Sequence, residues 1–193
     1  PNLILNQFKG KYGSSRAFFY DGLLKTEWQF SPSGRLSVLG YRSFDEFRFD
    51  NETSFEWQSD MLTMNISSAL AKNISFRLNG NISNYRSVIN GLVPGYESRL
   101  ASTILHKQAK AQVDAVTGNH KWSVGLDFIH TGISPGKREP SGTASNINFE
   151  EIEHEQGMEY AAFISDEINI TEKISLQAGV RYALYRYMGP KKV

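Results

Sequence analysis

The chain of 193 residues carries 21 basic and 20 acidic side chains, and a net charge of +1 gives no field that would make nucleic acid the main partner. The absence of cysteine excludes disulfides, thiolate metal sites and cysteine nucleophiles, and no run approaches the roughly 18 consecutive apolar residues of a membrane-spanning helix. A hydrophobic content of 40% is compatible with a soluble protein, so the class must come from the residue pattern.

Alternation of apolar and polar residues is the main local signal, because successive side chains of a strand point to opposite faces. In residues 74–83, for example, the apolar Phe76 and Leu78 flank the polar Arg77. In chain order the predicted strands are 24–30, 35–44, 55–66, 74–83, 99–116, 122–128, 159–168 and 174–182. We therefore expect an all-β fold, an antiparallel up-and-down meander of about eight strands.

Residues 101–116 fit two patterns. Ala101, Leu105 and Ala109 also form a helical stripe of good helix formers. We predict a strand, because Leu105 and Val113 alternate with polar neighbours and a helix would interrupt the meander.

The predicted connections alternate between short and long. The short ones are turn-like, at 31–34, 67–73, 117–119 and 169–172. The long ones, at 45–54, 87–98 and 131–157, are rich in Gly, Pro, Asn and charge. All short turns then lie at one end of the sheet, which is the polarity of outer-membrane barrels with short periplasmic turns and long extracellular loops.

The last third of the chain resembles a known family. Residues 159–168 form an aromatic strand that ends in Asp-Glu, and after a short turn residues 176–182 read Leu-x-x-Gly-x-Arg-Tyr. This hairpin, the strand 119–128 before it and the Ile-Ser-Pro-Gly of 133–136 that opens a long loop are similar to barrels of TonB-dependent outer-membrane receptors. Within this family the sequence resembles the SusC-like or related receptors of Bacteroidetes.

The resemblance implies one domain, 1–193, that is part of a larger transmembrane β-barrel, commonly of 22 strands, in the bacterial outer membrane. Its implied partners are outer-membrane lipid, a plug domain of the same protein, TonB acting through an N-terminal segment, and an extracellular small-molecule or oligomeric substrate. Neither a TonB-binding segment nor a Gly-rich plug pattern appears here, and Pro1 opens no signal-peptide layout, so we expect the natural protein to begin upstream.

The sequence holds no motif of bond chemistry. His106, His120, His130 and His154 lack metal-ligand spacing, and the acidic residues of 150–155 are expected to be a solvated charge run. No nucleophile elbow, P-loop or dinucleotide fingerprint is present. We predict no enzyme, no cofactor and no metal site.

Function is expected to be uptake of an extracellular nutrient: an iron chelate, an oligosaccharide or a peptide. The polar faces of the strands would then face the plug or the substrate path, unless they are the solvent face of an ordinary antiparallel sheet. The substrate-path candidates are Arg77, Asn79, Gln108, Lys110, Gln177, Arg181, Phe47, Trp57 and Tyr96.

Two alternatives remain open. A complete eight-stranded barrel, lipocalin-like or of the small outer-membrane type, would pair its first and last strands. A soluble β-sandwich would bury Phe76, Leu126 and Val180 in a dry interior between two sheets.

Overall fold

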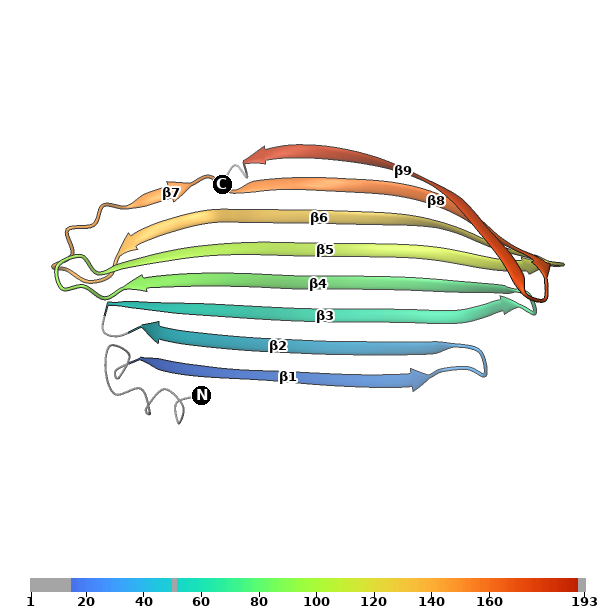
Figure 1. The fold of residues 1–193 in the computed structure, drawn as a ribbon, viewed down its shortest axis with the longest axis horizontal. Coiled ribbons are helices and arrows are strands. Elements are labelled where there is room, and N and C mark those ends of the chain that lie inside the picture. The colour runs from blue at the N-terminus through green and yellow to red at the C-terminus, as the bar shows by residue number, and fades with distance from the viewer. Residues whose placement is uncertain (1–14, 50–51, 191–193) are drawn as a thin grey trace.

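The computed structural model describes residues 15–49 and 52–190. These residues form one antiparallel sheet, drawn in Figure 1. Its strands are β1 (Arg16–Gln29), β2 (Arg35–Phe49), β3 (Thr53–Ala71), β4 (Ile74–Gly91), β5 (Ser98–Thr117), β6 (His120–Pro140), β7 (Glu150–Ile152), β8 (Glu155–Thr171) and β9 (Ile174–Pro190). In the described part of the chain, no helix is long and apolar enough to cross a membrane.

The strands follow one another as a meander, in the order β1-β2-β3-β4-β5-β6-β8-β9. The short β7 pairs with the outer end of β6, where β8 no longer does. The predicted all-β meander is therefore confirmed, with nine strands in place of about eight. Residues 101–116 lie within β5, so the strand prediction is right and the helical alternative is wrong.

The strands extend farther than predicted into three expected long loops. β2 runs on to Phe49, β4 to Gly91 and β6 to Pro140. The prediction that loops fill 45–54, 87–98 and 131–157 is therefore wrong for the residues at the start of each range, which continue the preceding strand. Hydrophobic alternation fades in these extensions, but backbone pairing continues without it, which the sequence pattern does not reveal.

The register aligns the apolar residues of all the long strands on one face of the sheet. Leu78 of β4 lies opposite Ile66 on β3 and Ala111 on β5. The same row continues through further cross-strand partners: Trp28, Leu36, Leu126, Ala162 and Tyr182. We call this side the outer face and the other the inner face.

The two faces differ in exposure as expected for a curved sheet, whose side chains splay apart on the convex side and crowd on the concave side. On the outer face Leu126 and Val180 are 65% and 71% exposed. On the inner face Asp114 and Asp127 are each only 8% exposed. The outer face is thus the convex one.

Neither alternative architecture fits. No second layer of the described chain covers Leu126 or Val180, so the dry interior of a β-sandwich is absent there. Within the described residues β1 and β9 are the two edges of the sheet and do not pair with each other, so these strands do not close an eight-stranded barrel.

The apolar band on the outer face runs diagonally across the strands. Toward the long-loop end it finishes at Phe18 on β1 but at Leu184 on β9, which is level in register with Thr26. The offset between Phe18 and Thr26 is eight residues along β1. A slab of constant thickness crosses tilted strands in this way, and strands of a barrel tilt by about 35–45°.

One glycine on the inner face provides space for an aromatic ring. A Cβ at Gly125 would collide with the Phe163 ring and lie 2.7 Å from the backbone oxygen of Ala111. Gly80 on the outer face has nothing within 4 Å of the same position.

We therefore expect Gly125→Ala to lower the free energy of unfolding of the full-length protein by about 1–3 kcal/mol, because the new methyl group overpacks the inner face. Gly80→Ala should change it by less than about 0.5 kcal/mol. Urea unfolding in lipid vesicles measures both variants, and equal effects would contradict the predicted fit between Gly125 and Phe163.

Candidate functional site

The inner face carries the polar side chains of alternate strand positions. The six polar residues predicted to line a substrate path all lie on it: Arg77, Asn79, Gln108, Lys110, Gln177 and Arg181. The register divides them among separate clusters, so they do not form one site.

Two of the six, Gln108 and Arg181, belong to a cluster around Asp127. Gln108 Nε2 donates to Asp127 Oδ1 over 2.9 Å, and one terminal nitrogen of Arg181 contacts both Asp127 Oδ2 at 3.2 Å and Glu159 Oε1 at 3.1 Å. Arg181 reaches Asp127 across the whole of β8, whose residue between them is the small, buried Ala161. A nearly buried carboxylate is thereby satisfied from β5 and β9 together.

Lys110 lies beside this cluster. It is the cross-strand neighbour of Asp127, and its Nζ lies 4.9 Å from the centre of the Phe163 ring. The ring covers Gly125 on the adjacent strand. An ammonium over an aromatic face is a cation–π contact, which keeps the amine turned along the inner face.

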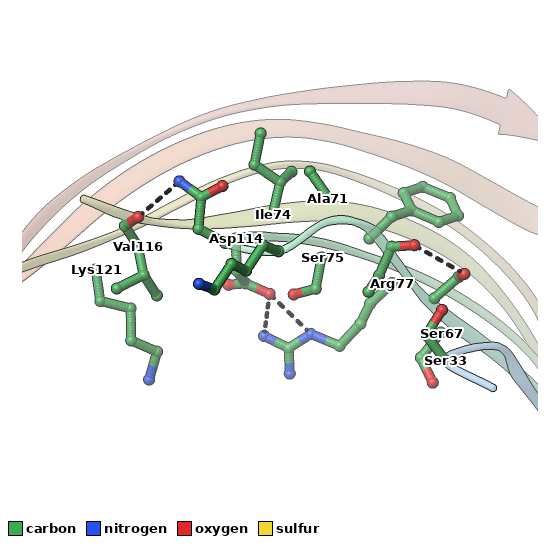
Figure 2. A pocket seen from close by; sticks show the side chains of 14 residues that line it. Ser33, Ser67, Ala71, Ile74, Ser75, Arg77, Asp114, Val116 and Lys121 are labelled. Atoms are coloured by element: carbon green, nitrogen blue, oxygen red, sulfur yellow. Dashed lines mark hydrogen bonds and ion pairs between the residues drawn. The ribbon is translucent and has the colours of Figure 1, made fainter.

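The second cluster surrounds Asp114 near the short-turn end. Arg77 donates to Asp114 Oδ2 from two nitrogens, at 2.7 and 3.1 Å, while Gln112 and Ser123 donate to Oδ1 at 2.8 and 2.6 Å. Figure 2 shows the Arg77–Asp114 pair, with Lys121 on the same side of the sheet. The pair lines a cavity of about 610 Å³ that is open to water and whose lining mixes serines and cations with apolar residues such as Ile74 and Phe76.

The other two predicted polar residues lie apart from these clusters. Asn79 donates to Asn65 on β3 over 2.6 Å. Gln177 lies opposite Glu167, whose carboxylate is 3.4 Å from Lys121 Nζ.

The predicted aromatic candidates lie at the long-loop end. Phe47 and Trp57 are on the inner face, where Phe55 lies opposite Phe47 and stacks on Trp57 with ring centres 6.0 Å apart and an interplanar angle of 7°. Tyr96 is in the β4–β5 loop and is 59% exposed. The structure brings Phe47 and Trp57 together and leaves Tyr96 on its own.

A cavity of about 500 Å³ lies beyond these aromatic residues, at the outer ends of β3 to β6 and against β7. Its lining mixes apolar and charged residues, among them Ile89, Leu100, Ile152, Arg138, Glu150 and Glu151. It offers a half-apolar surface with charges of both signs.

The loops above this cavity are hydrogen-bonded to each other. Asn146 donates to the Gly95 carbonyl from its backbone at 2.9 Å and from its side chain at 3.1 Å. The Glu97 carbonyl accepts from Ser145 Oγ at 2.6 Å and from the Ser141 backbone at 2.9 Å. Gly95 has a φ of +80°, which favours glycine in this turn.

Sequence reasoning missed the acidic centres of both clusters, Asp114 and Asp127, and their neighbours Glu159 and Phe163. Their alternation in phase with Gln108 and Arg181 could have placed all four on the inner face. It could not have selected them, since their partners on other strands are 9 to 54 residues away in sequence.

The described residues include no group of three or more His, Cys, Asp and Glu side chains that could hold a metal ion. In the acidic segment 150–155, His154 Nε2 is 4.0 Å from Glu151 Oε1, and both side chains are well exposed. The segment provides β7, which is a strand addition to β6.

Solved structures with this fold are receptors and transporters. The chain resembles BauA, the ferric preacinetobactin receptor from Acinetobacter baumannii, with a TM-score of 0.74 and 13% identity over 91% of this chain and 35% of that one. The copper transporter OprC matches with a TM-score of 0.71 and 9% identity over 88% of this chain and 29% of that one. The ferric citrate transporter FecA matches with a TM-score of 0.69 and 11% identity over 91% of this chain and 31% of that one. The sheet thus matches part of the β-barrel of TonB-dependent receptors and spans about a third of their length.

No protein-family model matches the sequence, and no curated protein matches it significantly.

Because Asp127 is nearly buried, we expect removal of its cation Arg181 to lower the free energy of unfolding more than removal of the exposed cation Lys25. Arg181→Met leaves a nearly buried carboxylate without its cation, and we expect the free energy of unfolding to fall by about 1–3 kcal/mol. Lys25→Met removes a cation whose 2.7 Å pair with Glu27 is about half exposed on both sides, and it should cost less than about 1 kcal/mol.

Urea unfolding of the two full-length variants in the same lipid vesicles gives the comparison. A cost for Lys25→Met that equals or exceeds the cost for Arg181→Met would refute the role assigned to Asp127.

Proposed function

We propose that this chain is a barrel segment of an outer-membrane TonB-dependent transporter that takes up an extracellular nutrient. The observation that carries the proposal is the single apolar band that the register builds across the outer face, opposite an inner face of paired charges. A band on the convex side of a sheet that bends toward its polar side is the arrangement of a barrel with lipid outside and water or protein inside.

Both edges of the sheet support a larger barrel. β1 and β9 are the edges of the sheet formed by the described residues, and in a bilayer the backbone groups on an edge must be satisfied by further strands. Strands of the same barrel on each side of residues 1–193 would supply these partners. The likeness to BauA, OprC and FecA supports the same arrangement.

In this proposal the polar inner face contacts a plug domain of the same protein, which TonB displaces through an N-terminal segment. Arg77, Asn79, Gln108, Lys110, Gln177 and Arg181 are the residues on that side that we assign to the plug contact or substrate path. Most of them are already engaged with Asp114, Asp127 or Asn65, so they would present a preformed polar wall.

Substrate capture is assigned to the long-loop end. Phe47 and Trp57 form an aromatic inner surface below the cavity at β7, and Tyr96 projects from the loop above. Aromatic faces and mixed charges suit an iron chelate, an oligosaccharide or a peptide. The resemblance of the last third of the chain to these receptors leads us to assign it to the SusC-like or a related branch.

Membrane insertion is tested by a charge on each face of β6. Leu126→Arg places a cation in the middle of the apolar band, so we expect it to destabilise the vesicle-inserted full-length protein by about 2–4 kcal/mol. Ile129→Arg, on the inner face opposite Gln108 and Glu159, should cost less than about 1 kcal/mol.

Urea titration of the two proteins folded into phosphatidylcholine vesicles measures the difference. Equal costs would mean that lipid does not contact the outer face, and the proposal would fail.

Transport is tested in cells that carry the full-length gene, with ferric citrate, copper and an oligosaccharide mixture as probes. At least one probe should enter only when the gene is present and only without a protonophore. Trp57→Ala should raise the KM for that probe about tenfold, while Phe44→Ala on the outer face should leave it unchanged. Gene-dependent uptake of no probe, or uptake that resists the protonophore, would count against energy-coupled transport.

A further inference from the structure

The cations of this sheet differ in whether the chain supplies a carboxylate partner. On the inner face Lys25, Arg77, Lys121 and Arg181 each have a carboxylate oxygen within 4.0 Å. On the outer face Lys107 and Arg186 have no such partner among the described residues, and both side chains are exposed. An unpaired cation at the edge of an apolar surface has to be satisfied by something outside the chain.

Lys107 and Arg186 lie at one level of the register, three strands apart. Lys107 of β5 is directly opposite His130 of β6, His130 is opposite Met158 of β8, and Met158 is opposite Arg186 of β9. We call Lys107, His130 and Arg186 the basic edge. No acidic side chain shares this row on the four strands.

The basic edge borders the apolar band at its long-loop side. The next row on the outer face consists of Ala109, Phe128, Tyr160 and Leu184. Two residues along a strand span about 7 Å, so the long side chains of Lys107 and Arg186 can keep their stems on the band and extend their charges to its border.

The neighbouring stretch of the same border serves as an internal comparison. On β2 and β3 the outer-face cation Arg42 lies 3.5 Å from the carboxylate of Asp60, and Gln58 donates to the same carboxylate over 2.6 Å. There the charge is compensated within the chain. Lys107 and Arg186 differ from Arg42 in having no carboxylate oxygen of the described residues within 4.0 Å.

We propose that the basic edge binds the phosphate groups of an anionic lipid in the leaflet on the long-loop side. This inference rests on the proposed function, because it requires lipid against the outer face. Ammonium and guanidinium groups form charge-assisted hydrogen bonds with phosphate oxygens, and the acyl chains of the same lipid would lie on Phe128, Tyr160 and Leu184. His130, whose Nε2 is 3.4 Å from Gln156 Oε1, completes the edge between the two cations.

The test uses the full-length protein in a neutral detergent, titrated with lipid A and, in parallel, with dephosphorylated lipid A. Native mass spectrometry measures the Kd of each. We expect a clear preference for the phosphorylated lipid, and we expect Lys107→Gln with Arg186→Gln to weaken its binding about 30-fold, or about fivefold for each charge removed.

Arg42→Gln is the matched control, because it removes an outer-face cation that Asp60 already compensates. It should change the Kd less than twofold, and binding of the dephosphorylated lipid should be unaffected by any of the variants. Inorganic phosphate at the same concentration should not displace the lipid, since it lacks acyl chains to contact the band.

Three results would overturn the inference. Equal affinity for the two lipids, or equal weakening by Arg42→Gln and by the double variant, would remove the basic edge as a phosphate site while leaving a vesicle-inserted transporter intact. A wild-type protein that does not fold into vesicles at all would overturn the proposed function and this inference with it.

Discussion

The structure depends on the parity of its cross-strand register. A slip of one residue between any two long strands would move every apolar side chain of one strand to the other face, because strand side chains alternate with a period of two. The pairing of Leu78 with Ile66 and Ala111 holds that parity at the centre of the sheet. The register shifts lie near strand ends, at Ala69/Ala71, Ala101/Thr103, Gln156/Gly157 and Asn169/Thr171, where a change of phase does not split the band.

The same parity places charged residues in different surroundings on the two faces. On the inner face, carboxylates such as Asp127 are nearly buried and collect partners from several strands, which fixes neighbouring strands to one another as well as neutralising charge. On the outer face the apolar rows end at a border of cations. The charge of Arg42 is neutralised there by Asp60 of the chain, and we propose that lipid phosphates neutralise Lys107 and Arg186.

Aromatic residues show how far local pattern carries. Trp28 lies on the outer face near the short-turn end of β1, and Trp57 lies on the inner face near the long-loop end of β3. Tyr182 lies at mid-band in the same row as Leu126 and Leu78, although Trp28 of that row lies near the end of β1. The diagonal course of the band explains this, since the border falls at a different level of the register on β9 than on β1, and no single strand contains that information.

By itself the sequence determined the all-β meander, the order of the short turns and the side chains of each face, because these follow from alternation and turn residues within a few positions. The short connections predicted at 67–73 and 169–172 are shorter than expected, since β3 runs to Ala71 and β8 to Thr171. Only the tertiary structure decided that β2, β4 and β6 continue beyond the apolar band, since pairing there needs no hydrophobic pattern. It also decided which polar residues meet. Arg181 and Asp127 are 54 residues apart, and their contact across Ala161 exists only because the registers of β6, β8 and β9 combine to bring them to one point on a curved surface.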